Sequence, residues 1–314
     1  MAGDVVIGVD LGGTTVSAGL VAADGEVLTH LQEPTRGSGA GTALATLVGL
    51  LDRLQEEARF RGVEVTGIGI GVPGTVDAER GVIGSDIHYV PELASTPLAD
   101  TIAKRLALPA FVDNDVNVLA LGEWMFGAGK GTRSLVVLAL GTGVGGGIIL
   151  DGQLHRGQGG FGGELGHVPI NFDGRPCICG GRGCLKAYVS GTDIGREGSE
   201  RLKRPVDAAT VFLLAERGDM VAREIVGEVC QALGAGLAVI VNGLNPELLL
   251  LAGSVAKSLK PLEREISAQT RLYAFERALA STRIEILTMD KNATVRGGAA
   301  LVAYETGRRS GGRP

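Results

Sequence analysis

Two glycine-rich turns with similar sequences end apolar runs in the first and second halves of the chain. The first, Asp10-Leu-Gly-Gly-Thr-Thr15, offers free backbone N–H groups, two hydroxyls and a carboxylate. Such N–H groups can surround phosphate oxygens, and Asp10 can hold a magnesium ion through a water. An ordinary hairpin is the alternative for one such turn alone. The second turn, Gly141-Thr142-Gly143, stands in an equivalent place and therefore favours phosphate binding.

Neither turn matches two common nucleotide-binding patterns. Both lack the Walker sequence of Gly, four residues and Gly-Lys-Ser/Thr. A dinucleotide-binding Rossmann turn leads into a helix, whereas residues 16–21 have the apolar pattern of a strand. The pair of turns predicts a nucleotide clasped between two domains.

Carboxylates and amides cluster in Asp113-Asn114-Asp115-x-Asn117, where a short apolar strand ends. Phosphoryl transfer needs an acceptor hydroxyl held in line and a carboxylate that takes its proton. We predict that Asp115 is this base and that Asn114 holds a substrate hydroxyl. Asp and Asn also form turns readily, so a turn without a catalytic role is the alternative for this motif alone.

One histidine and three cysteines lie close together in the sequence, as Glu164-Leu-Gly-His167 followed by Cys177, Cys179 and Cys184. In a chain expected in the cytosol, such crowding indicates a metal site before disulfides. His167 and three thiolates supply the four ligands of a closed, structural zinc site, whereas a catalytic zinc keeps one position open. Buried free thiols are the alternative, because the Cys-x-Cys spacing is shorter than the commoner Cys-x-x-Cys.

The elements that must position these groups follow a pattern that occurs twice. A strand, a Gly/Thr turn, a second strand and an Asp-Gly pair come in this order at 5–25 and again at 135–152. Asp-Gly between apolar runs is a strong hairpin signal. The repeat indicates an ancient duplication, and hairpins combined with βα units imply mixed sheets. We expect an α/β fold of two domains whose mixed sheets face a central cleft.

The spacing of apolar residues predicts the remaining elements. Helices are expected near 44–62, 97–108, 206–216, 221–243 and 293–304, and further strands at 27–31, 65–71, 111–112, 247–251 and 284–287.

Composition and charge exclude several classes of protein. The chain has 314 residues, enough for about two domains, and its 45% hydrophobic and 21% charged residues exclude global disorder. Glycine makes up 51 of the 314 residues, so tight turns and close backbone contacts are expected. A net charge of −5 argues against a nucleic-acid partner. Short apolar runs and the lack of a basic leader argue against a membrane or secretory protein, so we expect a cytoplasmic one.

Together the motifs resemble the ROK family of sugar kinases and repressors, over nearly the whole chain, and the length and plan are closest to its bacterial glucokinases. The resemblance implies a two-domain fold of the actin/hexokinase (ribonuclease H-like) type. It also implies ATP with Mg²⁺, a structural Zn²⁺, and transfer to a hexose hydroxyl, commonly O6. The motifs that carry it are Asp10-x-Gly-Gly-Thr, Asp113-Asn-Asp115, Gly141-Thr-Gly143, Glu164-x-Gly-His167 and Cys177-x-Cys179-Gly-x-x-Gly-Cys184.

The resemblance also assigns roles to single residues. It implies that His167 serves twice, with one ring nitrogen on zinc beside Cys177, Cys179 and Cys184 and the other toward the sugar. The residues implied at the sugar are Gly74, Asp86, Asn114, Asp115, Glu164, His167 and Lys186. The residues implied at ATP are Asp10, Gly12, Gly13, Thr14, Thr15, Thr142, Gly143, Gly253 and Ser254.

One sugar position departs from the family pattern. The family usually follows its last cysteine with an apolar residue and a glutamate that binds sugar, but here Leu185 is followed by Lys186. A lysine has donors and no acceptor, so we predict weak glucose use and a better substrate such as an N-acyl hexosamine, fructose or a cyclitol. A lysine that points to solvent is the alternative.

A sugar-sensing protein without turnover is the alternative function. Family repressors carry an N-terminal helix-turn-helix, whereas here the first strand begins at Val5 and the base Asp115 is retained. These two features favour the enzyme.

The expected domains follow from the repeat and the resemblance. A smaller N-terminal α/β domain is expected over 1–114, joined by the C-terminal helix 293–306. A larger α/β domain is expected over 115–292, with the zinc-binding loop at 164–186, and a disordered tail over 307–314. The resemblance also implies a homodimer or homotetramer.

Overall fold

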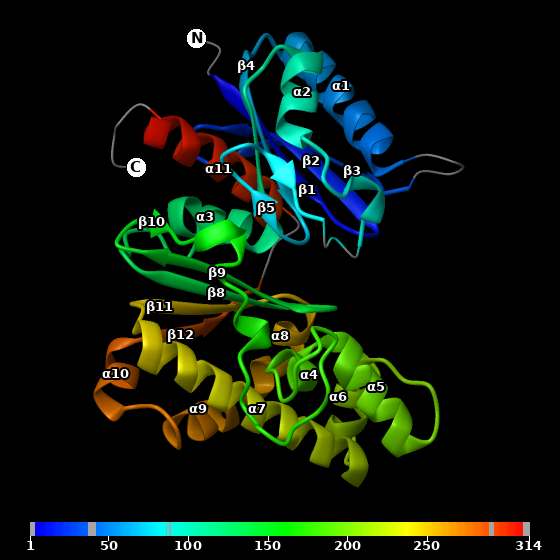
Figure 1. Cartoon of the computed structure of the whole chain (residues 1–314), viewed down its shortest axis with the longest axis vertical. Coiled ribbons are helices and arrows are strands. Elements are labelled where there is room, and N and C mark those ends of the chain that lie inside the picture. The colour runs from blue at the N-terminus through cyan, green and yellow to red at the C-terminus, as the bar shows by residue number, and fades with distance from the viewer. Residues whose placement is uncertain (1–3, 37–41, 86, 88, 289–291, 310–314) are drawn as a thin grey trace. The chain divides into compact units, whose positions relative to one another are not determined.

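The computed structural model describes residues 4–36, 42–85, 87, 89–288 and 292–309. The main strands form two five-stranded mixed sheets (Figure 1). The first has the strand order β3-β2-β1-β4-β7, in which β1 pairs antiparallel with β2 and parallel with β4. Its strands are β1 (Val5–Leu11), β2 (Thr15–Ala22), β3 (Val27–Pro34), β4 (Val65–Val72) and β7 (Ala110–Asn114).

The second sheet repeats the strand order of the first. Its order is β10-β9-β8-β11-β12, with β9 antiparallel to β10 and β11 parallel to both β8 and β12. Each sheet thus has three strands that follow one another in the chain and then two parallel strands, which confirms the expected mixed sheets. The strands are β8 (Leu135–Leu140), β9 (Val144–Leu150), β10 (Gln153–Leu154), β11 (Leu248–Ala252) and β12 (Arg283–Ile286).

The last helix, α11 (Ala293–Arg309), packs directly on the first sheet because glycines leave room for its backbone. A Cβ added to Gly8 of β1 would lie 1.9 Å from the carbonyl oxygen of Val295, and one added to Gly69 of β4 would lie 1.9 Å from that of Gly298. No larger side chain fits at these contacts. Part of the high glycine content therefore serves helix–sheet packing rather than turns.

Helix α1 (Ala43–Arg61) covers the same sheet with a leucine-rich face. Thr42 caps its start by accepting a hydrogen bond from the backbone N–H of Ala45 at 3.2 Å, and Gly62 ends it with a φ of 68°. Its buried leucines join those of α2 (Leu98–Leu106) and of the strands in one hydrophobic core.

By its internal contacts the chain divides into two compact units. The first consists of Met1–Thr132, Gly147–Gly162 and Asp290–Pro314, and the second of Arg133–Gly146 and Gly163–Met289. The first unit extends beyond the boundary expected at 114, because α3 (Asp115–Phe126) packs against α11 at glycines of both helices. Helix α11 also continues to Arg309, into the segment expected to be a disordered tail.

Within the second unit, the 25-residue helix α7 (Met220–Leu244) forms the core. Among the described residues it alone is long and apolar enough to cross a membrane, and 67% of its most apolar window is buried inside the protein. A buried core helix meets the same criterion, and α7 packs as one. The other helices of the second unit are α4 (Lys186–Val189), α5 (Gly191–Leu202), α6 (Ala208–Glu216), α8 (Ser254–Leu259), α9 (Glu263–Arg271) and α10 (Glu276–Ser281).

The five helices expected from apolar spacing are confirmed as α1, α2, α6, α7 and α11, with ends that differ by a few residues. Helices α3, α4, α5, α8, α9 and α10 lie outside these five expected ranges. The short elements are β5 (Val76–Asp77), β6 (Val82–Ile83) and the 3₁₀ turns η1 (Pro91–Leu93), η2 (Gln158–Gly160), η3 (Leu165–His167) and η4 (Lys260–Leu262).

Candidate functional site

The first glycine-rich turn connects β1 and β2, and a buried threonine stabilises it by hydrogen bonds. The N–H of Gly12 donates to the carbonyl of Thr15 at 2.9 Å. The fully buried Thr35 donates its hydroxyl to the carbonyl of Gly12 at 2.6 Å and its backbone N–H to that of Thr14 at 2.9 Å. Gly13 completes the turn, and Thr14 and Thr15 are exposed at its tip. The turn therefore has a fixed shape and presents its hydroxyls outward.

Asp10 and Asp115, 105 positions apart in the sequence, come together in the first unit. Burial and the nearby charge of Asp10 raise the pKa of Asp115 to about 7. Burial also raises the pKa of Asp10, against a hydrogen bond from Thr294 that lowers it. A carboxyl group with a pKa near neutrality is suited to accept a proton at physiological pH.

Asn114 caps the helix that begins at Asp115. Its Oδ1 accepts hydrogen bonds from the backbone N–H groups of Val116 at 2.9 Å and Asn117 at 3.2 Å. Its Nδ2 donates to the carbonyl of Gly74 at 3.0 Å, so Gly74 and Asn114 are neighbours, as the sugar assignment requires. An amide nitrogen carries two hydrogens, and one is left for a substrate hydroxyl.

The role implied for Asp86 at the sugar stays a prediction, and Asp113 has a partner inside the protein. Asp86 lies outside the described residues. Asp113, grouped in the sequence with Asn114 and Asp115, points into the protein, where it accepts a hydrogen bond from Arg156 Nε at 2.7 Å. Nothing in the local sequence marks Arg156 as a site residue, so it was not predicted.

The second glycine-rich turn, between β8 and β9, lies beside the turn that follows β11. Strands β8 and β11 are parallel neighbours, so both turns stand at carboxyl ends of the second sheet. A Cβ added to Gly253, which has a φ of 99°, would lie 2.5 Å from the carbonyl oxygen of Leu140. The structure thus brings the predicted phosphate residues of the second unit together: Thr142, Gly143, Gly253 and Ser254.

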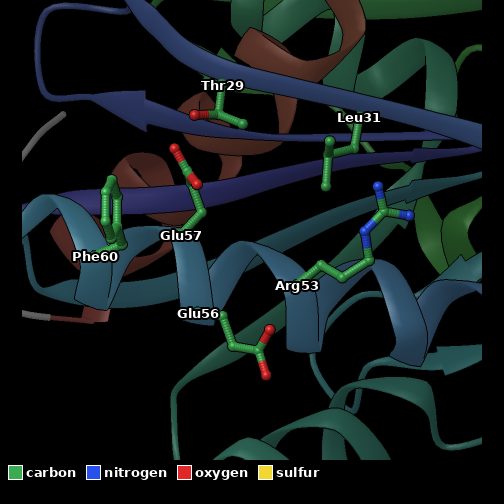
Figure 2. A pocket seen from close by; sticks show the side chains of 6 residues that line it. All are labelled: Thr29, Leu31, Arg53, Glu56, Glu57 and Phe60. Atoms are coloured by element: carbon green, nitrogen blue, oxygen red, sulfur yellow. The ribbon is translucent and has the colours of Figure 1, made fainter.

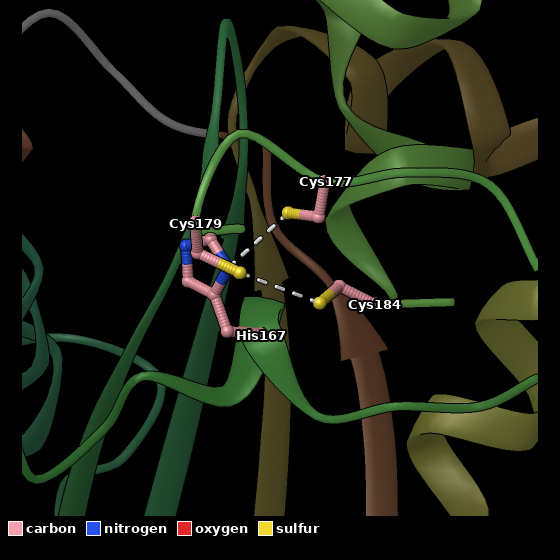
Figure 3. Close-up of side chains that lie close together, drawn as sticks. All are labelled: His167, Cys177, Cys179 and Cys184. Atoms are coloured by element: carbon pink, nitrogen blue, oxygen red, sulfur yellow. Dashed lines mark hydrogen bonds between the residues drawn. The ribbon is translucent and has the colours of Figure 1, made fainter. Parts of the chain in front are cut away.

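His167 and the three cysteines converge on one point of the second unit (Figure 3). One potential ligand atom from each residue lies within 4.8 Å of the others. Cys179 Sγ and Cys184 Sγ are 3.7 Å apart, and Cys177 Sγ and His167 Nδ1 are 3.5 Å apart. A tetrahedral zinc requires about 3.8 Å between sulfurs and about 3.6 Å between nitrogen and sulfur. The donor set and its spacing therefore fit zinc.

Backbone geometry fixes the cysteine loop. Gly183, with a φ of 68°, packs so closely on Asn171 that an added Cβ would lie 1.6 Å from its carbonyl oxygen. A hydrogen bond from the backbone of Gly181 lowers the pKa of the exposed Cys179 thiol. Burial raises the pKa of the Cys184 thiol to about 12, and the neighbouring thiols add to this rise. Zinc binding would displace these thiol protons.

Glu164 and Lys186 have different surroundings. Glu164 is exposed, and its Oε2 lies 4.0 Å from His167 Nε2, the ring nitrogen that faces away from the cysteines. Lys186 Nζ instead donates to Asp193 Oδ2 at 2.8 Å, and its side chain is only 15% exposed. Ser190 and Arg196 also bind Asp193. Lys186 therefore does not point to solvent but forms a largely buried ion pair.

The pairing also accounts for the charge state of Asp193. Burial alone would raise the pKa of Asp193, but hydrogen bonds from Lys186 and Ser190 outweigh burial and hold that pKa below its usual range.

Two pockets on the protein contain none of the predicted site residues. One, of about 360 Å³, lies between β3 and α1 and is lined by Thr29, Leu31, Arg53, Glu56, Glu57 and Phe60 (Figure 2). The other, of about 510 Å³, lies against α9 and β12 in the second unit. The chemically competent groups thus lie elsewhere.

Comparison with known proteins agrees with these motifs. A model of the ROK family matches residues 6–305. The chain is 32% identical over 315 residues to a glucokinase of Halalkalibacterium halodurans, covering 95% of each protein. It is 35% identical over 266 residues to an N-acetylmannosamine kinase of Yersinia pestis, covering 85% of this chain and 88% of the relative.

Solved structures show the same relationship. A ROK hexokinase from Thermus thermophilus superimposes with a TM-score of 0.84 at 31% identity, covering 97% of this chain and 99% of the other. A ROK glucokinase from Streptomyces griseus, solved in complex with glucose and AMPPNP, has a TM-score of 0.75 at 29% identity and covers 95% and 98%. The chain belongs to the ROK family.

Proposed function

We propose that this protein is an ATP-dependent hexose kinase in which Asp115 is the general base. The observation that carries the proposal is the placement of Asp115 beside Asp10 at the start of α3, with a pKa raised to about 7. The glucokinase relative and the structure solved with glucose and AMPPNP support the same reaction.

The residues of the first unit divide the chemistry among them. The free amide hydrogen of Asn114 orients the acceptor hydroxyl, and Asp115 takes its proton as the oxygen attacks the terminal phosphorus of ATP. The turn at 12–15 offers its N–H groups and hydroxyls to the phosphates. Asp10 fits the role of a magnesium ligand, through a water, because a divalent cation offsets the repulsion between Asp10 and Asp115. The same ion would neutralise the negative charge of the ATP phosphates.

The second unit supplies the other phosphate turns and, we propose, a structural zinc. Zinc on His167 Nδ1 and the three cysteines would fix the imidazole and leave Nε2 for a sugar hydroxyl beside Glu164. Its contribution is order in the loop, since all four ligands come from the protein.

A coupled assay for ADP release over a panel of hexoses tests the function. We expect turnover with at least one sugar. Tight sugar binding with no turnover on any sugar would favour the sensing protein instead. The location in the cytoplasm remains a prediction from the sequence, and a homodimer or homotetramer remains a prediction from the family resemblance.

The raised pKa of Asp115 predicts a pH dependence. Below its pKa the carboxyl group is protonated and cannot accept the hydroxyl proton, so kcat/KM for the sugar should fall about tenfold per pH unit below about pH 7. Steady-state rates between pH 5 and 9 measure this limb. A profile that is flat from pH 5 to 7 would contradict an unprotonated Asp115 as the base.

The ion pair of Lys186 predicts the sugar preference. Asp193 accepts one hydrogen bond from the ammonium group, and a lysine cannot accept a hydrogen bond from a sugar hydroxyl. Because a hydrogen bond to a charged group contributes about 1.5–3 kcal/mol, we expect glucose to bind roughly 10- to 150-fold more weakly than with a glutamate there. We expect a better substrate among other sugars, such as an N-acyl hexosamine, fructose or a cyclitol, and the N-acetylmannosamine kinase relative supports the first of these.

A double variant tests this preference without creating a new repulsion. Lys186→Glu alone would place two carboxylates side by side, so Asp193→Asn is added, with Asp193→Asn alone as the control. The double variant should lower the KM for glucose by at least about tenfold. A low KM for glucose in the natural protein, unchanged in the double variant, would show that Lys186 does not set specificity.

A further inference from the structure

We propose that Arg156 is a positioning residue for the catalytic base: it holds Asp113, and through Asp113 it fixes the start of α3, where Asn114 and Asp115 lie. The inference rests on the proposed kinase function. All of the residues involved belong to the first unit.

The guanidinium group of Arg156 bridges two buried carboxylates. Its Nε donates to Asp113 Oδ2 at 2.7 Å, and its Nη2 donates to Glu305 Oε1 at 2.6 Å. The side chains are 15%, 2% and 3% exposed, respectively. Burial would lower the pKa of Arg156, but the two carboxylates outweigh burial and raise it, so the charge is kept.

The other oxygen of Asp113 reaches the catalytic end of α3. Asp113 Oδ1 accepts hydrogen bonds from the backbone N–H of Asn114 at 2.7 Å and from Asn117 Nδ2 at 3.0 Å. These two partners flank Asp115 in the chain. One carboxylate therefore connects Arg156 to both sides of the base.

Three distant segments meet to build this arrangement. Arg156 follows β10, and its carbonyl accepts a hydrogen bond from Gly162 at 2.7 Å. The ring of Tyr304 on α11 lies 5.7 Å from the guanidinium carbon, and the tyrosine hydroxyl accepts a hydrogen bond from the N–H of Leu154 at 3.0 Å. Contacts of its backbone with Gly162 and of its side chain with Tyr304 therefore fix Arg156 in place beside Asp113.

Stability alone does not account for such a cluster. Desolvation of buried ion pairs largely cancels their attraction, and apolar replacements are often equally stable. The bridge orients the two carboxylates, because a planar guanidinium holds them at set angles. A lysine would contact them only as a point charge. The geometry therefore points to placement of Asn114 and Asp115.

The test compares Arg156→Lys with the natural protein. Lysine keeps the positive charge but lacks the planar guanidinium that contacts both carboxylates. We expect kcat to fall about 10- to 100-fold, the scale of a small misplacement of catalytic groups. The KM for ATP should change less than about twofold. Asp113→Asn keeps the shape of the side chain and removes its charge. It should likewise lower kcat and leave the KM for ATP nearly unchanged. Arg105→Lys, which alters the exposed pair of Arg105 with Asp52, is the control and should match the natural protein.

Hydrogen exchange of the Asn114 amide provides a readout that does not need activity. This amide donates to Asp113 Oδ1, so its exchange should speed up at least about tenfold in Arg156→Lys at an unchanged melting temperature. Unchanged exchange, or a kcat equal to that of Arg105→Lys, would overturn the inference. If the natural protein phosphorylates no sugar, the kinase proposal fails, and the exchange result still decides the role of Arg156.

Discussion

The Asp115→Asn variant is expected to lose about 10²- to 10⁴-fold in turnover, the usual contribution of a general base. Sugar affinity should largely survive, because an asparagine keeps an oxygen that accepts a hydrogen bond from the acceptor hydroxyl. Steady-state kinetics with the best sugar of the panel measure the loss, and calorimetry measures the affinity. Turnover close to normal would remove Asp115 from the mechanism.

The same variant should gain stability, which separates a catalytic loss from misfolding. At pH 8 the folded protein holds an ionised Asp115 whose pKa is raised from 3.8 to about 7 by burial and Asp10. Such a group destabilises the fold above its unfolded pKa, and the penalty is complete only above its folded pKa. We expect Asp115→Asn to be more stable at pH 8, by roughly 2–4 kcal/mol, and this gain to shrink toward pH 4. A lower melting temperature at pH 8 would contradict a pKa of Asp115 raised by burial and Asp10.

The second large effect concerns the cysteine cluster. We expect one zinc per chain by elemental analysis, and we expect Cys179→Ser to lose zinc, melt at a lower temperature and bind sugar more weakly. A structural zinc contributes directly to folding, and the loop that it ties carries His167. Cys230→Ala is the matched control, because Cys230 is buried in α7 outside the cluster and its loss should leave zinc bound. Metal-free protein with full activity would refute the site.

The hairpins and the repeated strand order could be predicted because their signals are local. Asp24-Gly25 and Asp151-Gly152 both adopt positive φ at the glycine, as an Asp-Gly hairpin requires. Helix α3 was missed for a physical reason: the Asp and Asn residues that indicate a turn are also the residues that cap a helix, and Asn114 does so here.

The contacts that could not be predicted are long-range. Arg156 meets Asp113 across 43 positions and Glu305 across 149, and neither pair leaves a periodic pattern in the sequence. The pairing of Lys186 with Asp193 spans only seven positions, but it depends on how α4 and α5 pack. The candidate residues could thus be named from motifs, whereas the partners that orient them required the structure.

Phosphorus NMR of a mixture of the protein, Mg-ATP and a hexose tests the hexose kinase reaction most directly. We predict that a new phosphate monoester, coupled to the protons of a sugar carbon, grows in step with ADP and stops in the absence of the sugar. The Asp115→Asn protein should form this product at least about a hundredfold more slowly. ATP that stays intact beside a bound sugar, or ADP formed with inorganic phosphate alone, would contradict a kinase that uses Asp115 to activate a sugar hydroxyl.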